Sequence, residues 1–123
     1  MTIAVPEVVE TIERLNAAFN RHDVDGIMAL MTDDCLFENT FPAPDGERYV
    51  GQAAVRAFWE RFFAASPNAV FEAEAVVACG EYAIHRWRYR WGNDGPNAGY
   101  VRGVDIFRVR DGKVAEKLSY VKG

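Results

Sequence analysis

The sequence predicts a single α+β domain over residues 1–123, with helices early in the chain and antiparallel strands late. Two observations lead to this class. Apolar residues recur at helical spacing through much of the first half, whereas the chain after residue 69 alternates in strand fashion between turn residues. The expected order is two helices, a strand, a short extended piece, a helix and four strands. Helices gathered before strands favour an α+β fold over a doubly wound one.

Three helices are expected. The first carries an apolar face formed by Val8, Ile12, Leu15 and Phe19. The second begins after Asp23, whose carboxylate is a good N-cap, and ends at residues 32–34. The third begins near Gly51 and shows the strongest amphipathic pattern, formed by Val55, Phe58, Trp59, Phe62 and Phe63.

The strands are expected over 35–41, 70–78, 82–91, 99–109 and 114–121. In the first of these, Cys35, Phe37, Asn39 and Phe41 share one face. Asp111 and Gly112 lie between two apolar runs, which is a strong signal for a tight hairpin. The last two strands are therefore expected to pair directly.

The segment 85–91 indicates which face of the sheet is interior. Successive residues of a strand point to opposite faces, so one face carries three arginines and the other carries His85, Trp87, Tyr89 and Trp91. Three unpaired guanidinium groups cannot be desolvated together, because each costs several kcal/mol. The aromatic face, with His85, is therefore expected to point inward.

The following strand places a carboxylate on the same interior side. Asp105 alternates with Gly103 and Phe107, whereas the opposite face of this strand carries three arginines. Desolvation of an unpaired carboxylate favours its protonated form, so Asp105 is expected to find a hydrogen bond or to be protonated. In the last strand, periodicity does not decide whether Lys117 and Ser119 or their neighbours face inward.

Asn39, His85 and Asp105 are thus three polar side chains directed among aromatic ones. A few polar groups in an aromatic setting are typical of a ligand pocket, and an ordinary core of this size would avoid most of them. The sequence therefore predicts a pocket for a small, largely apolar molecule. Its expected walls are Phe37, Tyr49, Trp59, Trp87, Tyr89 and Phe107.

Several classes of function are disfavoured. The net charge of −4 argues against a nucleic-acid partner. No signal peptide and no apolar stretch long enough for a bilayer is apparent, so no membrane association and a cytoplasmic location are expected. The two histidines and the cysteines lack metal-ligand spacing, and no phosphate loop appears, so neither a metal nor another cofactor is expected. Cys35 and Cys79 both lie in apolar segments and are expected to be buried.

Three segments, NRHDVDGIMALMTDDC (20–35), YVGQAAVRAFW (49–59) and GVDIFRVRDGKV (103–114), resemble the SnoaL-like branch of the nuclear transport factor 2-like superfamily, which includes the ketosteroid isomerases. The resemblance implies a cone-shaped, strongly curved antiparallel sheet wrapped around a long helix, a cystatin-like α+β barrel. It also implies a homodimer that pairs through the outer face of the sheet. The fold hosts many activities, so it does not by itself imply one of them.

Carried over residue by residue, the resemblance implies the following roles. Asp105 stands where the ketosteroid isomerases have a protonated aspartate, but Asn39 stands at their base position and Leu15 at their tyrosine position. The familiar isomerase mechanism is therefore not encoded. Polyketide cyclases of the SnoaL type use an Asp with help from a pocket His, roles that Asp105 and His85 are able to fill. Epoxide hydrolases of this fold use an Asp–Arg–Asp set together with Tyr and Asn. Of these groups, Asn39 and Asp105 are present here, and the paired arginine is absent.

Two functions remain open. The first is a cofactor-free enzyme performing proton-transfer chemistry, such as isomerisation or cyclisation, on a small hydrophobic carbonyl compound. Asp105 would be its acid or base, His85 the partner and Asn39 a hydrogen-bond donor. The second is a non-catalytic protein of the same fold that binds a hydrophobic ligand or serves as a dimeric interaction module.

Overall fold

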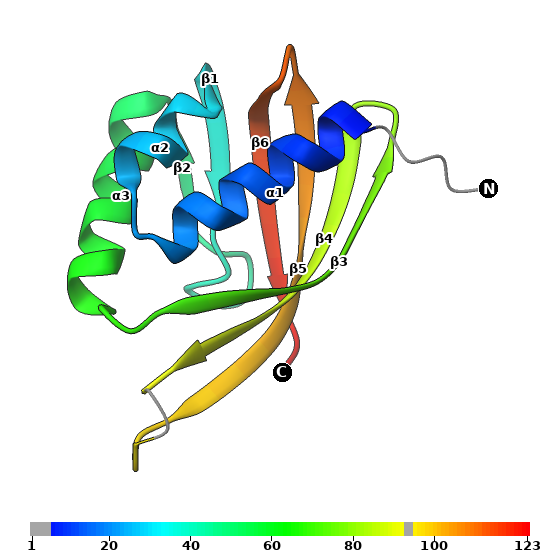
Figure 1. Cartoon of the computed structure of the whole chain (residues 1–123). Coiled ribbons are helices and arrows are strands. Elements are labelled where there is room, and N and C mark those ends of the chain that lie inside the picture. The colour runs from blue at the N-terminus through cyan, green and yellow to red at the C-terminus, as the bar shows by residue number, and fades with distance from the viewer. Residues whose placement is uncertain (1–5, 93–94) are drawn as a thin grey trace.

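The computed structural model describes residues 6–92 and 95–123, which form three helices and six strands (Figure 1). The helices are α1 (Pro6–Asn20), α2 (Val24–Ala29) and α3 (Gln52–Ala65). The strands are β1 (Met31–Glu38), β2 (Arg48–Val50), β3 (Val70–Cys79), β4 (Tyr82–Trp91), β5 (Gly99–Arg110) and β6 (Lys113–Val121). The predicted class and element order are confirmed.

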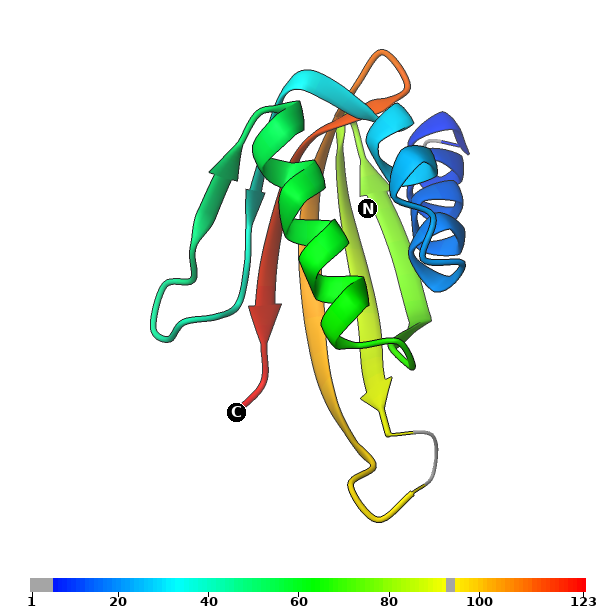
Figure 2. The same cartoon turned by 90° about the vertical axis from the view of Figure 1, so that its left-hand side faces the viewer.

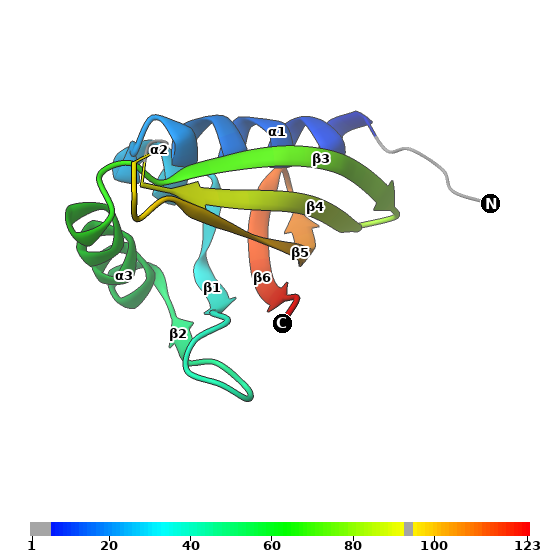
Figure 3. The same ribbon diagram turned by 90° about the horizontal axis from the view of Figure 1, so that it is seen from below.

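All six strands form one sheet in the order β2-β1-β6-β5-β4-β3. Neighbouring strands are antiparallel except β1 and β6, which run parallel and so correct the expectation of a wholly antiparallel sheet. The register is irregular at three of the pairings, and such bulges bend strands and increase their twist. Figure 3 shows the resulting curl, with α1 and α3 on the hollow side of the sheet.

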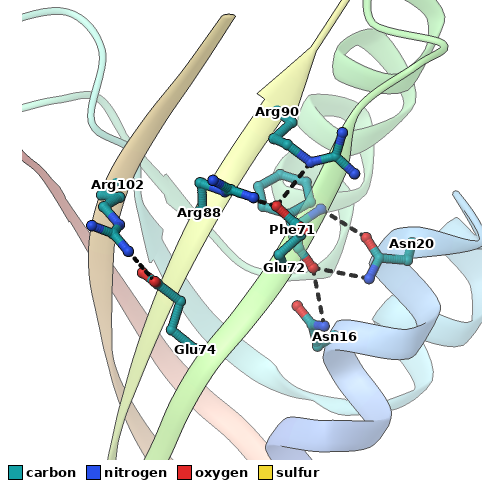
Figure 4. Close-up of polar contacts among 8 residues, drawn as sticks. All are labelled: Asn16, Asn20, Phe71, Glu72, Glu74, Arg88, Arg90 and Arg102. Atoms are coloured by element: carbon teal, nitrogen blue, oxygen red, sulfur yellow. Dashed lines mark hydrogen bonds and ion pairs between the residues drawn. The ribbon is translucent and has the colours of Figure 1, made fainter. Parts of the chain in front are cut away.

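The two longer helices cover different parts of the hollow side. Helix α1 packs on β3 and β4, and α3 packs on β1 and β2. Two asparagines fix α1 to the edge strand β3 (Figure 4). The amide of Asn20 accepts from Phe71 N at 2.8 Å and donates to Phe71 O at 3.0 Å, and Asn16 Nδ2 donates to the same oxygen at 3.3 Å. These bonds pair the backbone N–H and C=O groups of Phe71, which lies on an edge strand, and hold that residue against α1.

Side chains determine where α2 begins and ends. The Asp23 carboxylate accepts from Gly26 N at 3.0 Å, which confirms its predicted N-cap role. After the helix, Gln52 Nε2 lies 3.0–3.2 Å from three backbone oxygens, those of Met28, Met31 and Thr32. One amide at the start of α3 therefore connects the last turn of α2 to the first two residues of β1. Strand β1 begins at Met31, four residues earlier than predicted from the sequence.

Phe41, Cys79 and Trp91 are predicted to point inward, but all three are exposed because each lies at or beyond the end of a strand. β1 ends at Glu38, so Phe41 lies beyond it and is 74% exposed. Cys79, the last residue of β3, is exposed, whereas Cys35 is buried as expected. The far ends of β4 and β5 extend past the rest of the molecule, where no helix covers them (Figure 2). Trp91, the last residue of β4, is accordingly 38% exposed.

Aromatic residues of α3 form the centre of the core. Trp59 is 3% exposed, and its ring centre lies 4.6 Å from that of Phe19 on α1 and 5.1 Å from that of Phe37 on β1. Phe58 meets the Phe37 and Trp59 rings edge-on, an arrangement that the aromatic quadrupole favours. This cluster joins both helices to the sheet and forms one wall of the site described next.

Candidate functional site

Four polar side chains lie together on the inner face of the sheet, and we call them the inner polar cluster. His85 is directly opposite Asp105, and Asp105 is directly opposite Ser119, across β4, β5 and β6. Lys117 stands two positions before Ser119 and so points to the same face. All four are buried, with exposed fractions from 3% to 8%. The orientation that periodicity left undecided in the last strand is thereby settled.

Lys117 connects the members of the cluster. Its Nζ lies 3.3 Å from Asp105 Oδ2 and donates a 2.9 Å hydrogen bond to Ser119 Oγ. Ring faces also attract an ammonium group at distances up to about 6 Å. Three rings have their centres 4.6–5.6 Å from the same Nζ, those of Phe37, Trp59 and Phe19. One carboxylate, one hydroxyl and three rings therefore surround the amine.

Six buried side-chain polar atoms have no hydrogen-bond partner among the described residues: Asn16 Oδ1, Thr32 Oγ1 and four at or beside the inner polar cluster. These four are Asp105 Oδ1, His85 Nε2, Trp59 Nε1 and Trp87 Nε1. Buried polar atoms are nearly always bonded, so each of these marks a place where a bound molecule or a water would be recognised. Together they supply a carboxylate acceptor, two indole N–H donors and an imidazole nitrogen.

Burial lowers the pKa of the two basic members of the cluster. It lowers the pKa of His85 below its ordinary 6.5; the Asp105 carboxylate opposes this shift and the Lys117 charge adds to it. The imidazole is therefore neutral at neutral pH. Burial also lowers the pKa of the Lys117 amine, again opposed by Asp105. The interior thus favours the neutral amine, and the carboxylate favours the ammonium ion.

A cavity of about 100 Å³ lies between α3 and the inner face. Asp105, Lys117 and Ser119 contribute its polar side, and Asn39 also lines it. Four of the expected wall residues line it as well: Phe37, Trp59, Trp87 and Tyr89. The volume is below the roughly 300–1,000 Å³ usual for ligand pockets, so a molecule held wholly inside would be small.

A smaller recess of about 10 Å³ continues inward. His85 and Phe107 line this recess and not the outer cavity, whereas Asp105 and Lys117 line both. The recess is about the size of one water molecule. A ligand in the outer cavity would thus meet Asp105 and Lys117 directly, and one water in the recess would be needed to reach His85.

The structure places two of the expected site residues differently. Tyr49 does not line the cavity: its ring centre is 5.9 Å from that of Phe37 and 4.9 Å from that of Phe58, so it supports the wall from behind. Asn39 follows the end of β1, instead of lying within a strand. It stands at the rim, where it also borders a surface groove together with Thr40. Asn39 is thus separate from the inner polar cluster.

Lys117 and Ser119 are the members of the inner polar cluster that were not among the predicted site residues, because alternation left the facing of β6 undecided. The missing information was the pairing of β5 with β6, in which Arg108 is opposite Glu116 and bonds to it at 2.8 Å. Because Arg108 lies on the arginine-bearing outer face, Glu116 does too, and Lys117 must then face inward. Complementary charge on adjacent hairpin strands was the signal available for this assignment.

No group of three histidine, cysteine, aspartate or glutamate side chains that could hold a metal ion occurs within residues 6–92 and 95–123. Over the same ranges, no helix has the length and apolar character required to span a membrane.

Comparisons with known proteins agree with the fold. A nuclear transport factor 2-like protein of unknown function from Mesorhizobium loti is 39% identical, with a TM-score of 0.80 over 96% of this chain and 93% of that one. A proposed polyketide cyclase from Sinorhizobium meliloti is 20% identical (TM-score 0.76; 90% and 94% covered). A proposed ketosteroid isomerase from Kribbella flavida is 18% identical (TM-score 0.79; 96% and 79% covered). At these lower identities the likeness concerns the fold alone.

A search of curated proteins found no match. The SnoaL-like domain family matches residues 12–117, which include both basic members and the carboxylate of the inner polar cluster. This match spans most of the sequence and agrees with the resemblance carried by the three segments quoted above. The chain therefore belongs to the SnoaL-like domain family.

Proposed function

We propose that this protein binds a small, largely apolar carbonyl compound in the aromatic cavity and performs cofactor-free proton transfer on it, as in isomerisation or cyclisation. The observation that carries the proposal is the placement of Asp105. Its Oδ2 is held by Lys117, and its Oδ1 has no partner among the described residues although the side chain lines the cavity. A positioned carboxylate of this kind suits a general acid or base.

The other polar groups have supporting roles in this proposal. His85 is neutral at neutral pH because burial lowers its pKa, so it is able to accept or relay a proton through the inner recess. Asn39 at the rim would donate a hydrogen bond to the oxygen of the carbonyl compound. The relatives named as a cyclase and an isomerase share the fold and are consistent with such chemistry.

The test measures proton transfer directly, without knowledge of the natural product. The probe is 2-indanone in D₂O, and NMR follows exchange of the protons next to its carbonyl. We expect exchange catalysed by the wild type and reduced about 10²–10⁴-fold in Asp105→Asn. Asp111→Asn, the same change in the exposed β5–β6 turn, is the matched control and keeps the wild-type rate. A folded Asp105→Asn protein with undiminished exchange would overturn the proposal.

One observation favours a second candidate function, non-catalytic binding. Asp105 is in an ion pair with Lys117, so the pair is also able to act as a fixed polar contact for a ligand. In that case the protein binds 2-indanone without catalysing exchange. Its affinity would also be constant between about pH 5 and 8, since no group in the site would need to titrate.

We also propose that a second copy of this chain covers the outer face of the sheet. That face exposes large apolar residues, among them Tyr82, Ile84 and Tyr120. It also carries both arginines and glutamates, so it is complementary in charge to itself, as a two-fold interface requires. Sedimentation equilibrium is expected to give a dimer for the wild type and a monomer for Ile84→Glu; a monomeric wild type would refute the dimer.

A further inference from the structure

We infer that Lys117 acts covalently, its Nζ condensing with the carbonyl carbon of the substrate to form an iminium ion. The inference rests on the proposed function, in that it takes a carbonyl compound as the occupant of the aromatic cavity. It goes further in assigning a nucleophile and an electron sink, roles that proton transfer by Asp105 alone does not require.

The position of Lys117 is unusual for a lysine. The sequence contains three lysines, and Lys113 and Lys122 are exposed near the two ends of β6, whereas Lys117 between them is 5% exposed. An ammonium group is strongly hydrated, so a lysine is almost never fully buried unless an anion pairs with it, as Asp105 does here. An apolar residue of similar volume would fill this place at lower cost. Desolvation of a lysine in an apolar cavity is one way in which proteins activate the amine as a nucleophile.

The groups around Nζ are those that a condensation needs. Asp105 Oδ2 at 3.3 Å is placed to remove a proton from the ammonium ion, and Ser119 Oγ at 2.9 Å is placed to relay one. Burial lowers the pKa of the amine, which makes its neutral, nucleophilic form more accessible. The amine borders the outer cavity and the inner recess, so it meets a bound carbonyl group from the same side as Asp105 does.

The condensation proceeds through a carbinolamine. The Asp105 carboxylate takes one proton from the ammonium ion, and the amine lone pair forms a bond to the carbonyl carbon. A proton moves from nitrogen to the former carbonyl oxygen, which gives a carbinolamine. Asp105 then returns its proton to that hydroxyl group, which leaves as water as the carbon–nitrogen double bond forms. Overall, the ammonium ion and the carbonyl compound yield the iminium ion and one water.

The charge at Nζ is +1 before and after this step. The Asp105 carboxylate and the three aromatic rings therefore face a cation at the start and at the end, and in between the proton held by Asp105 leaves both partners neutral, so no buried charge is left uncompensated. The iminium ion draws electrons from the neighbouring carbon more strongly than a carbonyl group does. Asp105, ionised again, then removes the proton from that carbon, which joins the covalent step to the proposed function.

The test traps the iminium ion in the wild-type protein. Benzaldehyde is the probe, because it is aromatic and small enough for the cavity. Cyanoborohydride reduces any imine to a stable benzylamine, which peptide mapping by mass spectrometry assigns to a lysine. At about pH 7 we expect Lys117 to be modified at least about tenfold faster than Lys113 or Lys122, the two exposed lysines near the ends of β6, which are internal controls. Modification of Lys117 at or below their rate would overturn the inference.

A second measurement separates this inference from the proposed function. Lys117→Arg keeps a cation beside Asp105 but cannot form an imine, and it is compared with the wild type in the 2-indanone exchange assay. Loss of exchange in the folded variant supports covalent action. Exchange at the wild-type rate refutes covalent action and leaves proton transfer by Asp105 standing. If neither 2-indanone nor benzyl alcohol, which lacks a carbonyl group, binds to the wild type, both proposals fail.

Discussion

The two faces of the sheet carry charge in opposite ways. On the outer face, Glu72 bonds to Arg88 and Arg90 at 2.8 Å each, and Glu74 bonds to Arg102 (Figure 4). These side chains are partly exposed, and water screens them. Within residues 6–92 and 95–123, the inner face has one ion pair, Lys117 with Asp105, in which both side chains are 6–7% exposed.

This difference indicates what each face contributes. Exposed ion pairs add little to stability, and several of them keep one face of a curved sheet soluble or ready for a partner. A buried ion pair costs desolvation energy that its attraction barely repays, and apolar residues would often serve stability better. The inner pair is thus poorly explained by stability and well explained by chemistry in the cavity. Four predictions test this contrast, in order of decreasing effect.

The largest effect is expected from breaking the inner pair. Lys117→Met leaves the Asp105 carboxylate buried without its cation, and we expect a loss of about 3–5 kcal/mol in the free energy of unfolding. Urea denaturation at neutral pH measures it. Lys117→Met combined with Asp105→Asn removes both charges and should recover much of the loss. Lys113→Met, an exposed lysine at the start of the same strand, is the control. A loss below about 1 kcal/mol for Lys117→Met would contradict the contrast.

The next effect concerns packing on the inner face. A Cβ atom at Gly103 would collide with the Trp87 ring and with the carbonyl oxygen of Tyr120. Gly103→Ala should therefore lower the free energy of unfolding by about 1–3 kcal/mol and distort the cavity wall, because the added methyl group overpacks the core. Gly99→Ala is the matched change, because Gly99 lies under the exposed Trp91, whose ring is able to move away. Equal losses in the two variants would show that the covered and uncovered ends of β5 do not differ.

The third prediction uses the protonation of His85. Because burial lowers its pKa below 6.5, the unfolded chain binds more protons than the folded chain between that lowered pKa and 6.5. Stability should therefore be full above about pH 6.5 and fall as the pH drops below it. The groups facing His85 from β5 and β6 are Asp105 and Lys117. Urea titrations between about pH 5 and 7 should show this slope in the wild type and a flatter one in His85→Asn.

A residue's place in the site could be predicted where it follows from alternation within one strand, and could not where it depends on contacts between distant parts of the chain. The inward placement of His85 and Asp105 follows from alternation within one strand, which the sequence displays directly. Lys117 depends on the register between two strands, since both faces of β6 mix polar with apolar residues. The position of Tyr49 outside the cavity depends on how the edge strand β2 packs beside β1. The exposure of Trp91 depends on where the helices stop covering the sheet. Neither is encoded in local periodicity.

The smallest effect is expected on the outer face. Glu72→Gln removes the acceptor charge of two arginines, but all three side chains are more than a third exposed. The Tm should change less than in any inner-face variant. About 0.5 M salt should reduce the Tm difference between the wild type and Glu72→Gln, because screening weakens the attraction that the variant removes. If a second copy covers this face, however, these pairs lie nearer to the interface and are screened less. A large Tm loss that depends on protein concentration would then show that the contrast between the faces holds for the monomer and not for the dimer.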